Sequence, residues 1–78
     1  LVYPSGVDVS SSALRFLTQQ LRQHRRTIGS RWRRLSAGRQ ALLTLAHLRM
    51  GHTYAQLAAG FGVGTTTAYR YVTEAVEL

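Results

Sequence analysis

The residues best suited to chemistry lie in the stretch GVGTTTAYRY, which runs from Gly62 to Tyr71. A glycine turn is followed by three threonine hydroxyls, two phenolic rings and one guanidinium group, with no acidic residue. Hydroxyl and guanidinium groups donate hydrogen bonds to phosphate oxygens and base edges, and a threonine methyl can contact a thymine methyl. No nucleophile stands beside a base, so these residues predict binding rather than catalysis.

The charge of the chain favours a polyanionic partner. Among its 78 residues, 10 are basic, all of them arginine, and 3 are acidic, which gives a formal net charge of +7. The acids are Asp8, Glu74 and Glu77, and the span from Val9 to Thr73 has no carboxylate side chain. Few arginines can therefore find an acidic partner within the fold. Such a field attracts nucleic acid first and an anionic membrane surface second.

Several other site chemistries are excluded or disfavoured. The chain has no cysteine, which excludes disulfides and thiolate metal ligands. His24, His47 and His52 have no acid at ligand spacing, so we expect no metal site and no cofactor in this chain. No apolar run reaches the roughly 18 residues that span a membrane. We therefore expect no membrane partner.

Apolar spacing and breaker residues predict an all-α domain of three to four helices. Residues 1–9 form an irregular lead-in, and residues 10–78 form one helical domain. In SSSALRFLTQQLRQHRR, Leu14, Leu17 and Leu21 share one face, as in an amphipathic helix.

The second predicted helix, AGRQALLTLAHLRM, follows a serine cap at Ser36 and stops before Gly51. Its apolar residues leave only a narrow polar face, which places this helix at the centre of the core. Those apolar residues are Leu42, Leu43, Leu45, Ala46, Leu48 and Met50.

The last two predicted helices meet the requirements of a helix-turn-helix motif over residues 53–77. Thr53 and Gln56 fit a capping box at the start of a short helix. Gly62 supplies a residue tolerant of positive φ in the turn, and Val63 supplies the apolar residue that follows it.

The second helix of this motif starts near Thr65 and has two faces. Its inward face holds the apolar positions Ala68, Tyr71, Val72, Ala75 and Val76. Its outward face holds the candidate base-contacting residues Thr65, Thr66, Tyr69, Arg70 and Thr73. A helix with this outward face suits the major groove of duplex DNA.

An arginine-rich segment, RQHRRTIGSRWRR, precedes the second helix. It holds six arginines in 13 residues around Trp32, which we expect in the core. Planar guanidinium groups suit phosphate, although a solvated charge run is the alternative. The candidate phosphate-contacting residues, from this segment and from the first turns of later helices, are Arg25, Arg26, Arg31, Arg33, Arg34, Arg39 and Thr53.

The stretch LSAGRQALLTLAHLRMGHTYAQLAAGFGVGTTTAYRYVTEAV, from Leu35 to Val76, resembles the helix-turn-helix domain at the front of bacterial insertion-sequence transposases of the IS5 type. The resemblance implies a homeodomain-like or sigma region 4-like fold that binds transposon terminal inverted repeats in the bacterial cytoplasm, at the nucleoid. Such DDE transposases use a divalent metal such as magnesium, held by an acidic triad in a separate domain. This fragment would then be the DNA-binding part of an enzyme, and a homodimer could form through the parent protein.

Two points remain open from the sequence. The family usually has serine where this chain has Gly64, so we expect Thr65 to cap the last helix instead. The same arrangement also resembles sigma region 4, which makes a transcription regulator or sigma-factor-like DNA-binding domain the alternative function. A third class is an interaction module in which the first helix meets a partner or a membrane surface.

Overall fold

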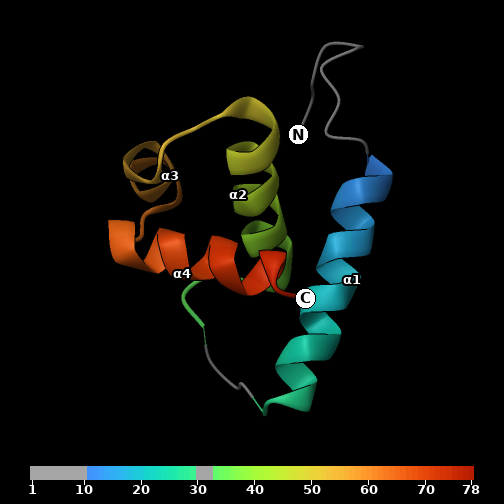
Figure 1. Cartoon of the computed structure of the whole chain (residues 1–78). Helices are drawn as coiled ribbons and strands as arrows, with labels where there is room; N and C mark the ends of the chain where they lie inside the picture. Colours follow the sequence, from blue (N-terminus) through green and yellow to red (C-terminus); the bar gives the residue numbers. More distant parts are fainter. Residues whose placement is uncertain (1–10, 30–32) are drawn as a thin grey trace.

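Four helices make up the part of the chain that the computed structural model describes, residues 11–29 and 33–78 (Figure 1). They are α1 (Ser11–Thr27), α2 (Ala37–Met50), α3 (Tyr54–Phe61) and α4 (Thr65–Val76). No strand occurs in these ranges, which confirms the predicted all-α class. The predicted lead-in at residues 1–9 lies outside the described residues, as do Arg31 and Trp32.

Local capping fixes where α2 and α3 begin and end. Ser36 Oγ accepts a hydrogen bond from the Arg39 amide at 3.2 Å at the start of α2, as predicted. At the start of α3, the Gln56 amide donates to Thr53 Oγ1 at 3.1 Å, and the Thr53 amide donates to Gln56 Oε1 at 2.9 Å. This reciprocal pair is the predicted capping box. Gly62 ends α3 with a φ of 71°, a conformation that favours glycine.

The core lies where α4 crosses α2 and packs against α3 (Figure 1). Its main cluster joins residues from all three of these helices with one residue that precedes α2, namely Leu35, Leu43, Leu57, Ala58, Ala68, Tyr71 and Val72. A smaller cluster joins α1 to α2 and α4 through Leu21, Ala37, Ala41 and Ala75. The predicted inward face of α4 is therefore confirmed, except at Val76, whose side chain is 59% exposed at the end of the helix.

The prediction that α2 is apolar almost all round is wrong at its last turn. Leu48 is 59% exposed and Met50 is also exposed, whereas the polar residues Gln40 and Thr44 are buried. The reason is that α4 crosses the first half of α2 (Figure 1). At this crossing the Gln40 side-chain amide donates a hydrogen bond to the Tyr71 carbonyl at 3.1 Å. The last turn of α2 extends beyond this crossing.

Candidate nucleic-acid interface

The outward face of α4 is exposed as the sequence predicts. Thr65, Thr66, Tyr69 and Arg70 are exposed, and Thr73 is half-buried. The Tyr69 ring is 52% exposed and meets the Tyr54 ring edge to face, with centroids 5.4 Å apart. This contact restricts how the exposed Tyr69 ring can move.

The start of α4 differs from the prediction that Thr65 caps the helix. Gly64 is the N-cap residue, with φ −76° and ψ 159°, and no side chain caps the helix. Thr65 is instead the first helical residue, and the Ala68 amide donates to the Gly64 carbonyl at 2.9 Å. The prediction was wrong because Gly64 itself adopts the extended conformation that a cap residue needs.

The three threonines of this first turn keep their hydroxyls available. Elsewhere in the described helices, threonine hydroxyls donate to the carbonyl four residues earlier at 2.7–3.0 Å, as at Thr18, Thr27, Thr44 and Thr73. Thr65, Thr66 and Thr67 lack a helical carbonyl at that position, because the residues four earlier lie at the end of α3 or in the turn. Their hydroxyls have no partner among the described residues.

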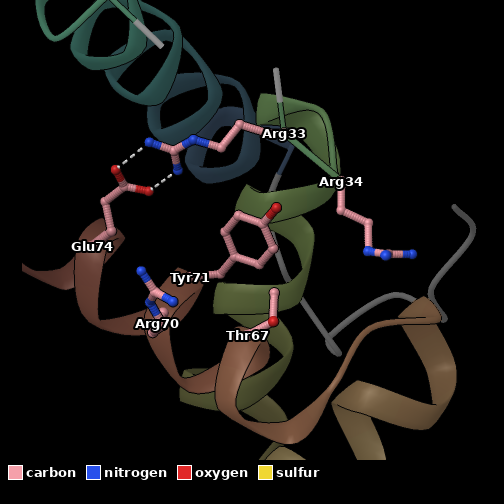
Figure 2. Close-up of a pocket in the computed structure, with 6 residues that line it drawn as sticks. All are labelled: Arg33, Arg34, Thr67, Arg70, Tyr71 and Glu74. Carbon is pink, nitrogen blue, oxygen red and sulfur yellow. Dashed lines mark hydrogen bonds and ion pairs between the residues drawn. The ribbon is translucent and has the colours of Figure 1, made fainter. Parts of the chain in front are cut away.

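Arg33 is one of the few arginines that find an acidic partner within the fold. Its guanidinium group forms a two-pronged ion pair with Glu74 of α4, in which Nη2 donates to Oε2 at 2.8 Å and Nη1 donates to Oε1 (Figure 2). Both side chains are 20% exposed. We therefore assign Arg33 to the fold rather than to phosphate.

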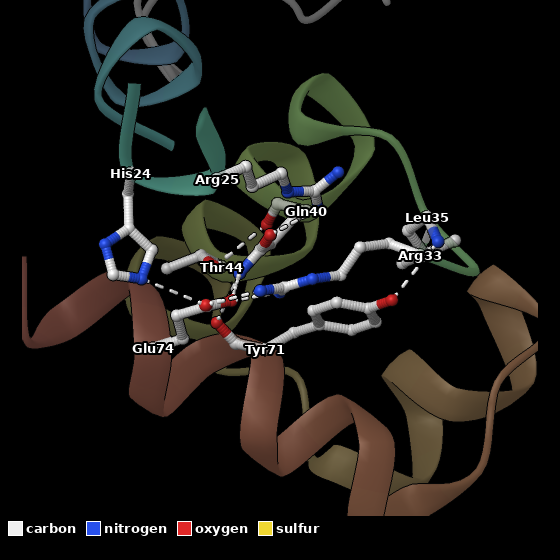
Figure 3. A network of polar contacts seen from close by, with 8 residues as sticks. All are labelled: His24, Arg25, Arg33, Leu35, Gln40, Thr44, Tyr71 and Glu74. Carbon is white, nitrogen blue, oxygen red and sulfur yellow. Dashed lines mark hydrogen bonds and ion pairs between the residues drawn. The ribbon is translucent and has the colours of Figure 1, made fainter. Parts of the chain in front are cut away.

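Glu74 is the centre of a polar network that ties α4 to the other elements (Figure 3). Gln40 of α2 donates from Nε2 to Glu74 Oε1 at 2.9 Å, and His24 Nε2 of α1 lies 3.2 Å from Glu74 Oε2. The hydrogen bonds from Arg33, with a further one from Gln40, lower the pKa of the Glu74 carboxyl to about 2, although burial opposes this shift. Glu74 is therefore anionic at neutral pH.

Arg25 joins the same network and also departs from its predicted role. Its Nη2 donates to Gln40 Oε1 at 2.6 Å across the α1–α2 contact. Burial, followed by the charge of Arg33, lowers the pKa of Arg25. Because this guanidinium group is half-buried and bonded to α2, we assign Arg25 to the packing of α1 rather than to phosphate.

The second half of the chain matches a known protein family. A family described as the helix-turn-helix of DDE superfamily endonucleases matches residues 33–78, more than half of the chain. The chain belongs to this family. No match was found among curated proteins or among solved structures.

The matched range contains α2, α3 and α4, whereas α1 precedes it. The helix-turn-helix consists of α3, the turn at Gly62 and α4, as the sequence predicts. A helix-turn-helix is a DNA-binding domain and not a catalytic one, and α4 is the second helix of this motif. No helix in the described residues is long and apolar enough to cross a bilayer.

The remaining phosphate candidates, one in α1 and the others in the matched range, lie at the surface. Arg26, Arg34 and Arg39 are exposed. The guanidinium carbon of Arg39 lies 5.3 Å from the centroid of the Phe61 ring, which holds the side chain between the start of α2 and the end of α3. Thr53 accepts the capping bond through its hydroxyl oxygen, so its hydroxyl hydrogen is free to donate.

Sequence reasoning missed the network residues His24, Gln40 and Glu74. Each comes from a different helix, so no spacing along the chain links them. The signal that could have found the network is the rarity of acids. In a chain with 10 arginines, an acid on the last helix can be expected to pair with a cation, and the fold brings Arg33 to Glu74.

Proposed function

We propose that this helix-turn-helix domain binds duplex DNA with α4 in the major groove. The observation that carries the proposal is the division of α4 into two faces. Ala68, Tyr71 and Val72 anchor one face in the core, while Thr66 and Tyr69 stand on the opposite, exposed face. A helix held in this way offers its outer side chains to base edges without disturbing the core.

The base-contacting set remains the predicted one, Thr65, Thr66, Tyr69, Arg70 and Thr73. The exposure of Thr65, Thr66, Tyr69 and Arg70 and the unpartnered hydroxyls of the first turn of α4 support it. Thr73 is half-buried and donates its hydroxyl to the Tyr69 carbonyl, so the structure lends this residue less support. Phosphate contacts are proposed for exposed cations on the flanks of the motif, Arg26, Arg34 and Arg39, and for the Thr53 hydroxyl at the start of α3. These groups would set the position of the domain on the duplex, because phosphate contacts fix register and orientation.

We further propose that the parent protein is a DDE transposase of the bacterial IS5 type and that the DNA is its terminal inverted repeat. The family match to helix-turn-helix domains of DDE endonucleases supports this proposal. The protein would then act in the bacterial cytoplasm, at the nucleoid, and could form a homodimer through the rest of the parent. A divalent metal such as magnesium would belong to a separate catalytic domain. In the described residues no three His, Cys, Asp or Glu side chains lie together, so we assign no metal-dependent step to them.

The test is a selection of preferred sites from random duplex DNA, followed by binding measured over a series of salt concentrations. The chain should enrich a defined site, and log affinity should fall linearly with log salt as counterions are displaced. Thr66→Ala should change the enriched site. Thr27→Ala removes another exposed helical threonine, from α1 outside the family match, and should leave the site unchanged. Affinity that is flat across the salt series, with no enriched site, would falsify the proposal.

A further inference from the structure

A cleft of about 520 Å³ lies on one flank of the recognition helix, between α4 and the segment that leads into α2 (Figure 2). Its lining residues are Arg33, Arg34, Thr67, Arg70, Tyr71 and Glu74. Thr67 lies three and four residues before Arg70 and Tyr71, and Glu74 lies four and three residues after them, so the four residues of α4 share one side of the helix. This side adjoins the outward face at Arg70, which belongs to both.

The walls of the cleft carry a net charge of +2, from three arginines and one glutamate. Glu74 is already paired, since both of its oxygens accept hydrogen bonds from Arg33. The guanidinium groups of Arg34 and Arg70, in contrast, have no partner among the described residues. The uncompensated charge of the cleft therefore resides on these two exposed side chains.

Neutral donors face the same space. The Tyr71 hydroxyl accepts a hydrogen bond from the Leu35 amide at 3.2 Å, so its own hydrogen remains free to donate. The Thr67 hydroxyl is half-buried and also unpartnered among the described residues. Two cations and two hydroxyl donors without a matching acceptor make a site for an anion with several oxygens. The cleft far exceeds the roughly 30 Å³ that a water molecule takes in the liquid, so a phosphodiester group fits with part of its hydration.

We propose that this cleft binds one backbone phosphate of the duplex, held between Arg34 and Arg70, with Thr67 and Tyr71 as neutral donors. The inference rests on the proposed DNA-binding function and changes one part of it. Arg70 becomes a phosphate ligand at the edge of the groove, and base reading is left to the threonines and Tyr69. Because the cleft lies beside the groove-facing side of α4, the phosphate belongs to the strand that forms one wall of that groove.

The experiment measures binding of the 78-residue chain to two duplexes, one of mixed sequence and one enriched by site selection, over a salt series. Arg34→Gln and Arg70→Gln should each weaken binding to both duplexes by the same factor and reduce the salt slope by about 0.9, the value for one phosphate contact. The matched control is Arg15→Gln, which removes the same charge from an exposed position on α1. It should leave the slope nearly unchanged. Thermal melts should confirm that all three variants fold like the parent, since each side chain is exposed.

A second arm locates the phosphate. In a set of enriched duplexes that each carry one neutral methylphosphonate, a single position should weaken binding by the parent chain. That position should have lost its effect in both Arg34→Gln and Arg70→Gln, and should have kept it in Arg15→Gln. Thr67→Val, which keeps the shape of the side chain, should reduce the effect at the same position.

The results separate this inference from the proposed function. If Arg70→Gln weakens only the enriched duplex and leaves the salt slope intact, Arg70 reads a base and the cleft assignment is wrong, while DNA binding stands. If Arg34→Gln and Arg15→Gln behave alike, the assignment is also wrong. If inorganic phosphate shifts the amide resonance of Thr67 and the duplex does not, the cleft belongs to a small phosphorylated ligand. If the parent chain binds neither duplex, both proposals fail together.

Discussion

The replacement Glu74→Gln tests how α4 is held against the rest of the domain. It keeps the shape of the side chain and removes the charge that Arg33 and His24 face. The pKa of Glu74 falls from its ordinary 4.5 to about 2 in the fold, a difference of about 2.5. At 1.36 kcal/mol for each pKa unit, this corresponds to about 3 kcal/mol of folding free energy at neutral pH. Both partners are 20% exposed, so solvent screening reduces the figure, and we expect a loss of about 2 kcal/mol.

The same shift predicts how stability changes with pH. A carboxyl whose pKa is lowered by folding contributes its full stabilisation above its ordinary pKa, here 4.5, and loses it as the pH falls to the folded value of about 2. The parent chain should therefore lose stability between pH 4.5 and 2. Glu74→Gln should show a smaller loss in this window, because its side chain does not titrate.

Thermal melts of both chains from pH 7 to pH 2 measure these effects. A loss of about 2 kcal/mol corresponds to a decrease in Tm of roughly 8–16 °C for a domain of this size. Glu77→Gln is the matched control, since it removes the same charge from an exposed residue at the end of the same helix. The control should keep the acid sensitivity of the parent. The reasoning is refuted if Glu74→Gln melts within 2–3 °C of the control at pH 7, or if Glu74→Gln also keeps that acid sensitivity.

Two further predictions concern local contacts. Tyr71→Phe removes the acceptor for the Leu35 amide and should lower the free energy of unfolding by about 1–3 kcal/mol, the cost of an unsatisfied buried donor, as measured by urea denaturation; no change would show that water replaces the hydroxyl. Thr53→Ala removes half of the capping box and should cost about 1 kcal/mol in the same assay, with Thr27→Ala as the control; equal costs for the two variants would contradict the assigned role of the cap.

The parts of the fold that could be predicted from the sequence are those with local causes. Ser36, Thr53 and Gln56 act on amides within three residues, so their capping roles are visible in the spacing alone. Gly62 is required by the turn, and its φ of 71° agrees with that requirement. The two faces of α4 follow from helical periodicity, which placed Ala68 and Val72 in the core correctly.

The parts that could not be predicted depend on where one helix crosses another. The exposure of Leu48 follows from the position at which α4 crosses α2, and no residue of α2 encodes that position alone. The burial of Gln40 has the same cause, because its partners Arg25 and Tyr71 lie 15 and 31 residues away along the chain. The cap at Gly64 was missed for a different reason. The prediction required a capping side chain, whereas an extended glycine serves with little loss.

The structure separates two neighbouring arginines that the sequence treats alike. Arg33 neutralises Glu74, the only acid of the network in the described residues. Without Arg33, an anionic Glu74 would stand beside the proposed phosphate cleft and repel the duplex. Arg34 forms no ion pair within the described residues, and its guanidinium group is exposed. Replacing Arg33 should therefore lower the stability of the fold and also make the cleft less positive. Replacing Arg34 should make the cleft less positive and leave the stability unchanged. The arginine-rich segment is thus not a uniform charge run, because its position relative to α4 pairs Arg33 with Glu74 and leaves Arg34 exposed at the proposed phosphate cleft.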